Sequence, residues 1–152
     1  MLVLIMSDIN SYTEVKIKLN SNVVTPIYQT INSACVDICA SEDKLLLPKT
    51  INMISTGIFM EIPIHYEVQI RSRSGLAMKG IFVLNSPGTI DADYRGEIKV
   101  ILYNISDTEF FIQTGDRIAQ MCLSRVYPIK WKIINELSET NRGTGGFGST
   151  GV

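Results

Sequence analysis

Short runs of apolar residues, often alternating with polar ones, recur along this chain and are separated by proline and glycine. Val15-Lys16-Ile17-Lys18-Leu19 shows the alternation that is typical of a half-buried strand. No window carries a convincing helical stripe, so many short strands indicate an all-β barrel or a double-sheet jelly roll. We expect strands at 15–19, 34–40, 51–55, 58–62, 66–70, 81–84, 98–103, 110–113 and 118–126. One helical turn is expected at 75–79, capped by Ser74 and ended by Gly80.

Composition narrows the class of protein further. The chain has 152 residues and a net charge of -1, which fits one globular domain without a basic nucleic-acid footprint. The apolar opening M-L-V-L-I-M is too short for a membrane span or a signal sequence. The chain has three cysteines, an odd number without the spacing of a zinc site, which argues against both a disulfide framework and a zinc site. We therefore expect a cytoplasmic protein with reduced thiols, and neither nucleic acid nor membrane as a partner.

The stretch 85–98, N-S-P-G-T-I-D-A-D-Y-R-G-E-I, carries an unusual mixture of residues. A turn signal at 86–88 precedes two carboxylates, Asp91 and Asp93, and the aromatic ring of Tyr94. In an extended backbone both acids would face one way and the ring the other. Two interpretations are open, a solvated β-hairpin and a ligand site that approaches the main chain at glycine.

Most arginines fall in segments that stand out for other reasons, which suggests a polyphosphate ligand, with structural salt bridges as the alternative. For Arg117 we favour a local salt bridge, because Asp116 precedes it. For Arg73 we favour the ligand, because Ser74 and Gly75 follow it at the start of the predicted helical turn.

Residues 141–152 read N-R-G-T-G-G-F-G-S-T-G-V. Such a glycine-rich segment cannot order itself alone, so one interpretation is a disordered tail. The other is a lid, because Arg142, Phe147, Ser149 and Thr150 supply a cation, a ring and two hydroxyls among exposed backbone N–H groups. No lysine or helix follows the glycines, so this is not a Walker P-loop.

Five segments in order resemble the trimeric deoxyuridine triphosphatase (dUTPase) family. They are A-C-V-D-I near residue 35, R-S-G-L-A at 73–77, the stretch from 85 to 97, G-D-R-I-A-Q at 115–120 and R-G-T-G-G-F-G-S-T at 142–150. The resemblance implies a distorted jelly-roll barrel over 1–140, with a swapped tail at 141–152 that closes over the site. It also implies a homotrimer with three interface sites that uses Mg²⁺ to hydrolyse dUTP to dUMP and pyrophosphate. Such an activity limits uracil in DNA and supplies dUMP for thymidylate synthesis.

The same resemblance assigns roles within 85–98. Asp91 matches the carboxylate that activates water for attack on the α-phosphorus, and Tyr94 matches the ring packed under the deoxyribose. The positions that match the uracil slot are Asn85, Gly88, Thr89, Ile90 and Lys99. A backbone wall at Pro87-Gly88 would exclude the thymine methyl better than flexible side chains would.

Phosphate contacts are implied for two further groups. The first is Arg73, Ser74, Gly75 and Gln120; the second is Arg142, Gly148, Ser149 and Thr150, with Phe147 stacked over uracil. Mg²⁺ would be held mainly by the triphosphate and water, with Asp37 in the outer shell or structural. Cys35 stands where the family usually has glycine. The rivals are a dCTP deaminase of the same fold and a trimeric module that binds dUTP without turnover.

Overall fold

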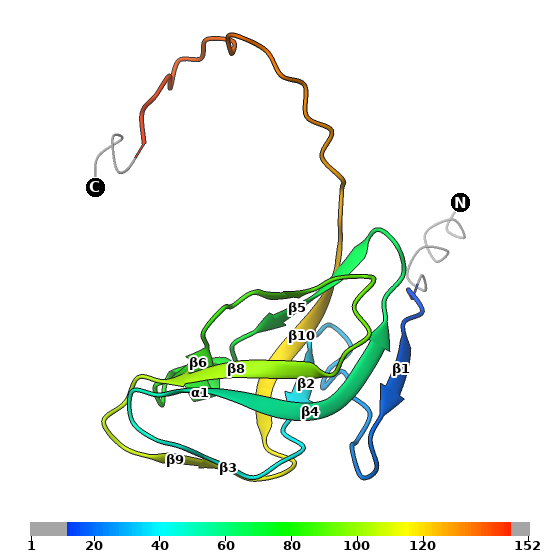
Figure 1. The fold of residues 1–152 in the computed structure, drawn as a ribbon, viewed down its shortest axis with the longest axis vertical. Helices are drawn as coiled ribbons and strands as arrows, with labels where there is room; N and C mark the ends of the chain where they lie inside the picture. Colours follow the sequence, from blue (N-terminus) through cyan, green and yellow to red (C-terminus); the bar gives the residue numbers. More distant parts are fainter. Residues whose placement is uncertain (1–11, 147–152) are drawn as a thin grey trace, which may run out of the picture.

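The structure is a computed structural model that describes residues 12–146. Its strands form two four-stranded antiparallel sheets and one two-stranded sheet (Figure 1). The strands are β1 (Lys16–Leu19), β2 (Val36–Cys39), β3 (Lys44–Leu46), β4 (Ile51–Glu61), β5 (Tyr66–Arg71), β6 (Ile81–Val83), β7 (Gly88–Ile90), β8 (Ile98–Asn104), β9 (Phe110–Ile112) and β10 (Arg117–Arg125). One short helix, α1 (Ser74–Ala77), interrupts them. The all-β prediction is confirmed; the jelly-roll connectivity stays a prediction.

The core is made by alternate residues of the two larger sheets. One sheet has the order β1-β4-β8-β6 and the other β2-β10-β5-β7. In β8 the side chains of Ile98, Val100 and Leu102 are fully buried, whereas those between them face outward. Val68 and Ile70 of β5 belong to the same buried cluster. The period of two that the sequence shows is therefore the period of burial.

Strand β4 runs through a glycine that the sequence suggested as a break between two strands. The pairing register with β8 shifts between Ser55 and Ile58, which marks a bulge. Gly57 lies in the bulge with φ of +66°, a conformation that glycine adopts without strain. The prediction of two separate strands at 51–55 and 58–62 is wrong, because this glycine bends one strand and does not end it.

The sequence did not predict two of the strands, and the predicted N-cap of the helix is the wrong residue. Strand β3 reads K-L-L and shows no alternation, and β7 begins at Gly88, which the sequence assigned to a turn. The N-cap position of α1 is Arg73, without a side-chain capping bond, so Ser74 is the first helical residue and not the cap. Gly80 has φ of +78° and its N–H bonds to the carbonyl oxygen of Ala77, which ends the turn as predicted.

A carboxylate ties the β9–β10 turn to the loop before β3. Asp43 Oδ1 accepts hydrogen bonds from Thr114 N at 2.7 Å and from Thr114 Oγ1 at 2.8 Å. These two bonds, the backbone one first, lower the pKa of Asp43. Because folding favours the ionised form, its contribution to stability is present above the unfolded pKa of about 3.9 and is lost as pH falls through the folded value.

We therefore expect Asp43→Asn to lower the melting temperature at neutral pH, with the gap to the wild type closing in acid. Thermal unfolding followed by circular dichroism between pH 7 and about pH 3 measures this gap. Glu109→Gln, which removes one charge from an exposed site, is the control. A gap that stays constant across this range would contradict the assignment.

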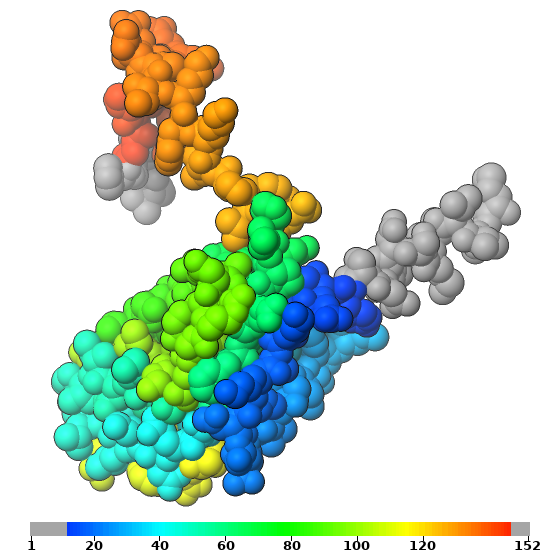
Figure 2. Space-filling model, turned by 45° about the vertical axis from the view of Figure 1, so that its right-hand side comes forward, coloured from blue at the N-terminus to red at the C-terminus, as the bar shows by residue number. Residues whose placement is uncertain are grey.

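The chain leaves the body after β10. Residues 126–146 form an arm without strands that projects away from the two sheets in both views (Figures 1 and 2). Its apolar side chains are exposed: Tyr127 is 74% exposed, Trp131 81% and Ile133 96%. Within the described chain, no helix has the length and apolar character needed to cross a membrane.

Candidate functional site

A cavity of about 450 Å³ opens beside the connection between β7 and β8, two strands that belong to different sheets and so do not form the β-hairpin considered from the sequence. It is lined by Met53, Thr89, Ile90, Asp91, Tyr94, Glu97, Lys99 and Ile101. Five of these were predicted as site residues from the sequence. Met53, Glu97 and Ile101 were not, although Met53 and Ile101 are cross-strand partners on β4 and β8. The structure therefore brings the predicted base, the ring and part of the predicted uracil slot into one cavity.

The two acids of the β7–β8 connection do not lie on an extended strand. Strand β7 ends at Ile90, and the N–H of Tyr94 then bonds to the carbonyl oxygen of Asp91 at 3.1 Å, which closes a turn over 92–93. The expected alternation of Asp91 and Asp93 is wrong for this reason. Both carboxylates are exposed, but only Asp91 lines the cavity.

Tyr94 is held across the turn by its hydroxyl group. The hydroxyl donates to the carbonyl oxygen of Glu97 at 3.0 Å, and the ring lies over Gly96. A Cβ atom added at Gly96 would stand 2.3 Å from the Tyr94 hydroxyl and 2.6 Å from Cζ. Glycine at 96 thus makes room for the ring, which is 45% exposed and offers an apolar surface to a ligand.

Glu97 links the β7–β8 connection to the bulge of β4. Its Oε1 accepts the N–H of Gly57 at 2.9 Å, and its Oε2 lies 3.6 Å from Lys99 Nζ. The ion pair with Lys99 is partly exposed and weak. The hydrogen bond from the Gly57 N–H instead holds the residue before β8 against β4. Glu97 therefore supports two cavity residues, Tyr94 through its carbonyl group and Lys99 through its carboxylate.

Asn85 and Gly88 lie beside the cavity and do not line it. Gly88 is buried and pairs with Ile70 of β5. A Cβ atom at Gly88 would lie 2.9 Å from Asn85 Nδ2, so the amide of Asn85 packs directly on this glycine. The Ser86–Pro87 peptide bond between them is cis. The turn thus leads directly into β7, whose residues Thr89 and Ile90 form a wall of the cavity.

A second cluster brings two of the predicted phosphate contacts, Arg73 and Gln120, close to Asp37. Its Oδ1 lies 2.9 Å from Arg73 Nε and its Oδ2 lies 3.1 Å from Arg117 Nη1. Arg73 Nη1 also donates to the carbonyl oxygen of Arg117 at 2.7 Å. Gln120 Nε2 donates to the carbonyl oxygen of Ser72 at 2.8 Å, which places its amide next to the segment that carries Arg73.

The salt bridges of this cluster differ from those expected. Arg117 does form an ion pair, but with the distant Asp37; the side chain of Asp116 instead accepts the N–H of Gln113 at 2.9 Å. Arg73, for which we favoured a ligand, is paired with the same aspartate. A phosphate group that binds Arg73 must therefore join or displace Asp37. Ser74 and Gly75 follow at the start of α1.

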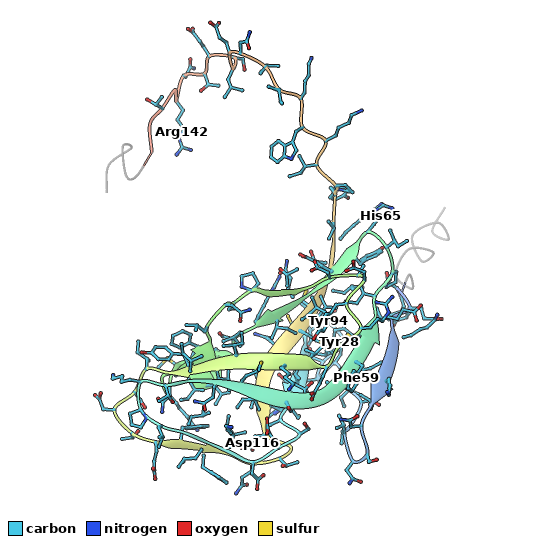
Figure 3. The ribbon with its side chains drawn as sticks, in the orientation of Figure 1. Tyr28, Phe59, His65, Tyr94, Asp116 and Arg142 are labelled. Carbon is cyan, nitrogen blue, oxygen red and sulfur yellow. The ribbon has the colours of Figure 1, made fainter. Side chains whose placement is uncertain are left out.

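The cavity and the Asp37 cluster lie apart within one chain. Ile90 of β7 is level with Val68 of β5, whereas Arg71 lies three residues further along β5. Each residue advances a strand by about 3.3 Å, so the separation is ~10 Å before the chain reaches Arg73. Tyr94 and Asp116, the neighbour of Arg117, accordingly occupy different parts of the molecule (Figure 3).

The tail residue Arg142 is further away still. It lies on the arm, far from Tyr94, where its Nε donates to the carbonyl oxygen of Gly145 at 2.8 Å (Figure 3). Phe147, Gly148, Ser149 and Thr150 lie outside the described residues. Among residues 12–146, the predicted site residues thus lie in three separate places of one chain.

Comparison with known proteins decides the family. The family model described as dUTPase matches residues 8–151. The chain belongs to the dUTPase family. A deoxyuridine 5'-triphosphate nucleotidohydrolase from Cytophaga hutchinsonii is 52% identical over 145 residues, which cover 93% of this chain and 94% of the relative.

Solved dUTPase structures share the fold. The dUTPase of Staphylococcus bacteriophage 80alpha, in a mutant form with dUpNHpp, matches with a TM-score of 0.85 and 26% identity, covering 93% of this chain and 100% of that one. A mutant dUTPase from phage phi11 of S. aureus, in which a structural Mg(II) ion is coordinated, matches with a TM-score of 0.77 and 21% identity, covering 84% and 100%.

The donor set of this dUTPase fits a metal that its substrate carries. Among residues 12–146, no three His, Cys, Asp or Glu side chains cluster as metal ligands. Both oxygens of Asp37 are already paired with arginines. Mg²⁺ commonly keeps several waters and binds through substrate phosphates, which needs no protein cage. The residues present are compatible with that arrangement.

In this dUTPase we expect Gly96→Ala to weaken dUTP binding about tenfold with little loss of stability. The added methyl group collides with the end of the Tyr94 side chain, which is 45% exposed and can swing outward. Isothermal titration with a non-hydrolysable dUTP analogue and thermal unfolding give the two quantities. Asp93→Ala, on the same turn but outside the cavity, is the control. Unchanged affinity would show that the ring position does not matter.

Proposed function

We propose that this chain hydrolyses dUTP to dUMP and pyrophosphate in a homotrimer whose sites are each shared between subunits. The observation that carries the proposal is the division of the site within one chain. The cavity holds Asp91, Tyr94 and Lys99, whereas Arg73 and Gln120 lie in the Asp37 cluster. A neighbouring copy can bring its own Asp37 cluster to the cavity.

Asp91 acts as the general base. Its exposed carboxylate follows a paired strand and lines the cavity, so it can hold a water molecule by one hydrogen bond and accept its proton as the oxygen attacks the α-phosphorus. The turn bond from Tyr94 N to Asp91 O fixes the backbone that carries the carboxylate. Pyrophosphate leaves from the opposite side of the phosphorus in an in-line displacement.

Tyr94 and β7 select the nucleoside. The ring of Tyr94 packs under the deoxyribose, where a 2'-hydroxyl group would collide with it. Thr89 and Ile90 present the backbone of β7 to the uracil edge, and pairing with Gln69 and Val68 of β5 holds that backbone rigid. A base whose edge leaves buried polar groups unpaired is rejected strongly, which disfavours cytosine.

The Asp37 cluster binds the phosphate chain. Arg73 and Gln120 supply a guanidinium and an amide beside the hydroxyl of Ser74 and the N–H of Gly75 at the start of α1. Asp37 orients the guanidinium of Arg73 before substrate arrives, which reduces the ordering cost of binding. Mg²⁺, bound by the triphosphate and water, would neutralise charge on the phosphate oxygens.

Two features support the homotrimer. The outward face of the β4–β8 pair carries exposed apolar side chains at and beside the cavity: Met53, which lines it, is 58% exposed, and Ile51, further along β4, is 59% exposed. The arm at 126–146 carries exposed apolar side chains away from its own body. A neighbouring copy would cover both surfaces and remove them from water.

The tail completes the site by closing over bound dUTP. Arg142, Gly148, Ser149 and Thr150 hold the γ-phosphate, and Phe147 stacks over uracil. Because the arm projects from the body before Arg142, the tail can reach a site on another subunit. Closure expels water and orders the phosphate chain in one step. We place the enzyme in the cytoplasm, where its nucleotide substrate and reduced thiols are expected.

The test is product analysis with purified protein, dUTP and Mg²⁺. We expect equal amounts of dUMP and pyrophosphate, with dCTP, dTTP and UTP hydrolysed far more slowly. Ammonia release from dCTP would support the deaminase instead. Binding of dUTP without pyrophosphate release would support a regulatory module. Light scattering during size-exclusion chromatography should give three chains, and an active monomer would contradict the shared site.

A further inference from the structure

Two cysteines face each other across the β2–β10 pair. Val36 of β2 is level with Met121 of β10 in an antiparallel pair, so the same register, continued by one residue before β2, places Cys35 opposite Cys122. Residues directly opposite in antiparallel strands have Cα atoms about 4.5–5.5 Å apart. A disulfide needs a Cα separation of about 4.4–6.8 Å. Continuation of the β2–β10 register therefore predicts a Cα separation within the range of a disulfide.

The third cysteine cannot take part. Cys39 lies on β2 four residues beyond Cys35, which is ~13 Å along the strand. That separation is beyond the reach of a disulfide without strand rearrangement. Cys39 is half-buried like the other two, so it is a matched internal control for thiol reactivity.

The facing thiol also affects the protonation of Cys35. Burial raises the pKa of Cys35, the neighbouring Cys122 thiol raises that pKa further, and the Arg71 guanidinium opposes both effects. Cys35 is therefore mostly protonated at neutral pH, so thiol exchange at this residue is slow and accelerates as pH rises. Both thiols are half-buried and not sealed inside the core.

We propose that Cys35 and Cys122 form a dithiol modification site that a small disulfide such as oxidised glutathione converts to an intramolecular disulfide. One protein thiolate attacks a sulfur of the reagent, which forms a mixed disulfide and releases one glutathione thiolate. The second protein thiol, deprotonated, then attacks the protein sulfur of the mixed disulfide and releases the other glutathione thiolate. Two protein thiols are oxidised, one reagent disulfide is reduced, and both protons end on glutathione.

The site lies beside the predicted phosphate-binding residues. Cys35 precedes Asp37 by two residues and Cys122 follows Gln120 by two, so on each strand the pair shares a face. Asp37 and Gln120 are themselves level with each other. A disulfide would tie β2 to β10 one step from the carboxylate that holds Arg73.

Mass analysis of the full-length chain tests this proposal. The protein is incubated with oxidised glutathione at about pH 8, denatured, alkylated and digested without reductant. We expect a loss of about 2 Da, alkylation at Cys39 alone, a linked peptide pair containing Cys35 and Cys122, and reversal by dithiothreitol. Three alkylated cysteines, glutathione adducts alone, or a linkage that includes Cys39 would overturn the proposal.

Variants sharpen the test without being essential to it. Cys39→Ser should still form the linked pair at the wild-type rate. Cys122→Ser should stop at a mixed disulfide with glutathione on Cys35. Cys35→Gly should form no intramolecular disulfide. A Cys39→Ser chain that fails to form the bond, while its circular dichroism spectrum matches the wild type, would contradict the assignment.

Discussion

Replacing Asp91 by asparagine is expected to lower kcat for dUTP by about 10²–10⁴-fold, the usual contribution of a general base. The amide has nearly the same shape but cannot accept a proton from water. Because Asp91 is exposed at the edge of the cavity, the fold and the affinity for a non-hydrolysable dUTP analogue should change little. Steady-state pyrophosphate release and calorimetric titration separate the two effects.

Asp93→Asn is the matched control. Asp93 is an exposed carboxylate on the same turn, two residues from Asp91, and it does not line the cavity. Removing its charge changes the local potential as Asp91→Asn does but should leave kcat unchanged. Full activity in Asp91→Asn, or equal losses in both variants, would remove Asp91 from its proposed role.

A chain that ends at residue 141 is expected to lose turnover on the order of a hundredfold, because the phosphate chain is no longer oriented or shielded from water. Its melting temperature should stay at the wild-type value, since residues 126–146 are mostly exposed and add no strand to either sheet. Stopped-flow hydrolysis and thermal unfolding measure the two quantities.

A substitution on the arm controls for nonspecific effects of changing this segment. Lys132→Ala alters an exposed arm residue before the tail and should leave kcat intact. If the truncated chain hydrolyses dUTP as fast as the full chain, the tail is not a lid. If the truncated chain unfolds at a lower temperature, the tail has a structural role that the exposed arm does not indicate.

Short-range patterns in the sequence predicted most of the fold. Alternation located nearly all the longer strands because one face of each is buried, as in β8. It did not find β3, which reads K-L-L, or β7, which begins inside the predicted turn; both strands are held by pairing, with β9 and with β5. Nor could it show that Gly57 bends β4, since a glycine that ends a strand and one that forms a bulge look alike in sequence.

The residues of the candidate site likewise include some that the sequence predicted and others that it could not. The residues around Asp91 were predictable because one local turn carries them. Met53 and Ile101 line the cavity because strand register makes them partners, which no local pattern reveals. The ion pairs of Asp37 join three separate segments, so sequence proximity suggested the wrong acid for Arg117. The sequence did not reveal contacts that depend on strand register or on the packing of distant segments.

The central claim, that each site combines Asp91 of one chain with Arg73 of another, is tested most directly by subunit mixing. Asp91→Asn and Arg73→Ala chains should each be nearly inactive as homotrimers. After unfolding and refolding together in equal amounts, random assembly should give about a quarter of the wild-type activity, because that fraction of sites receives both intact residues. Activity no higher than that of the separate variants would show that both residues serve the same chain and would contradict the shared site.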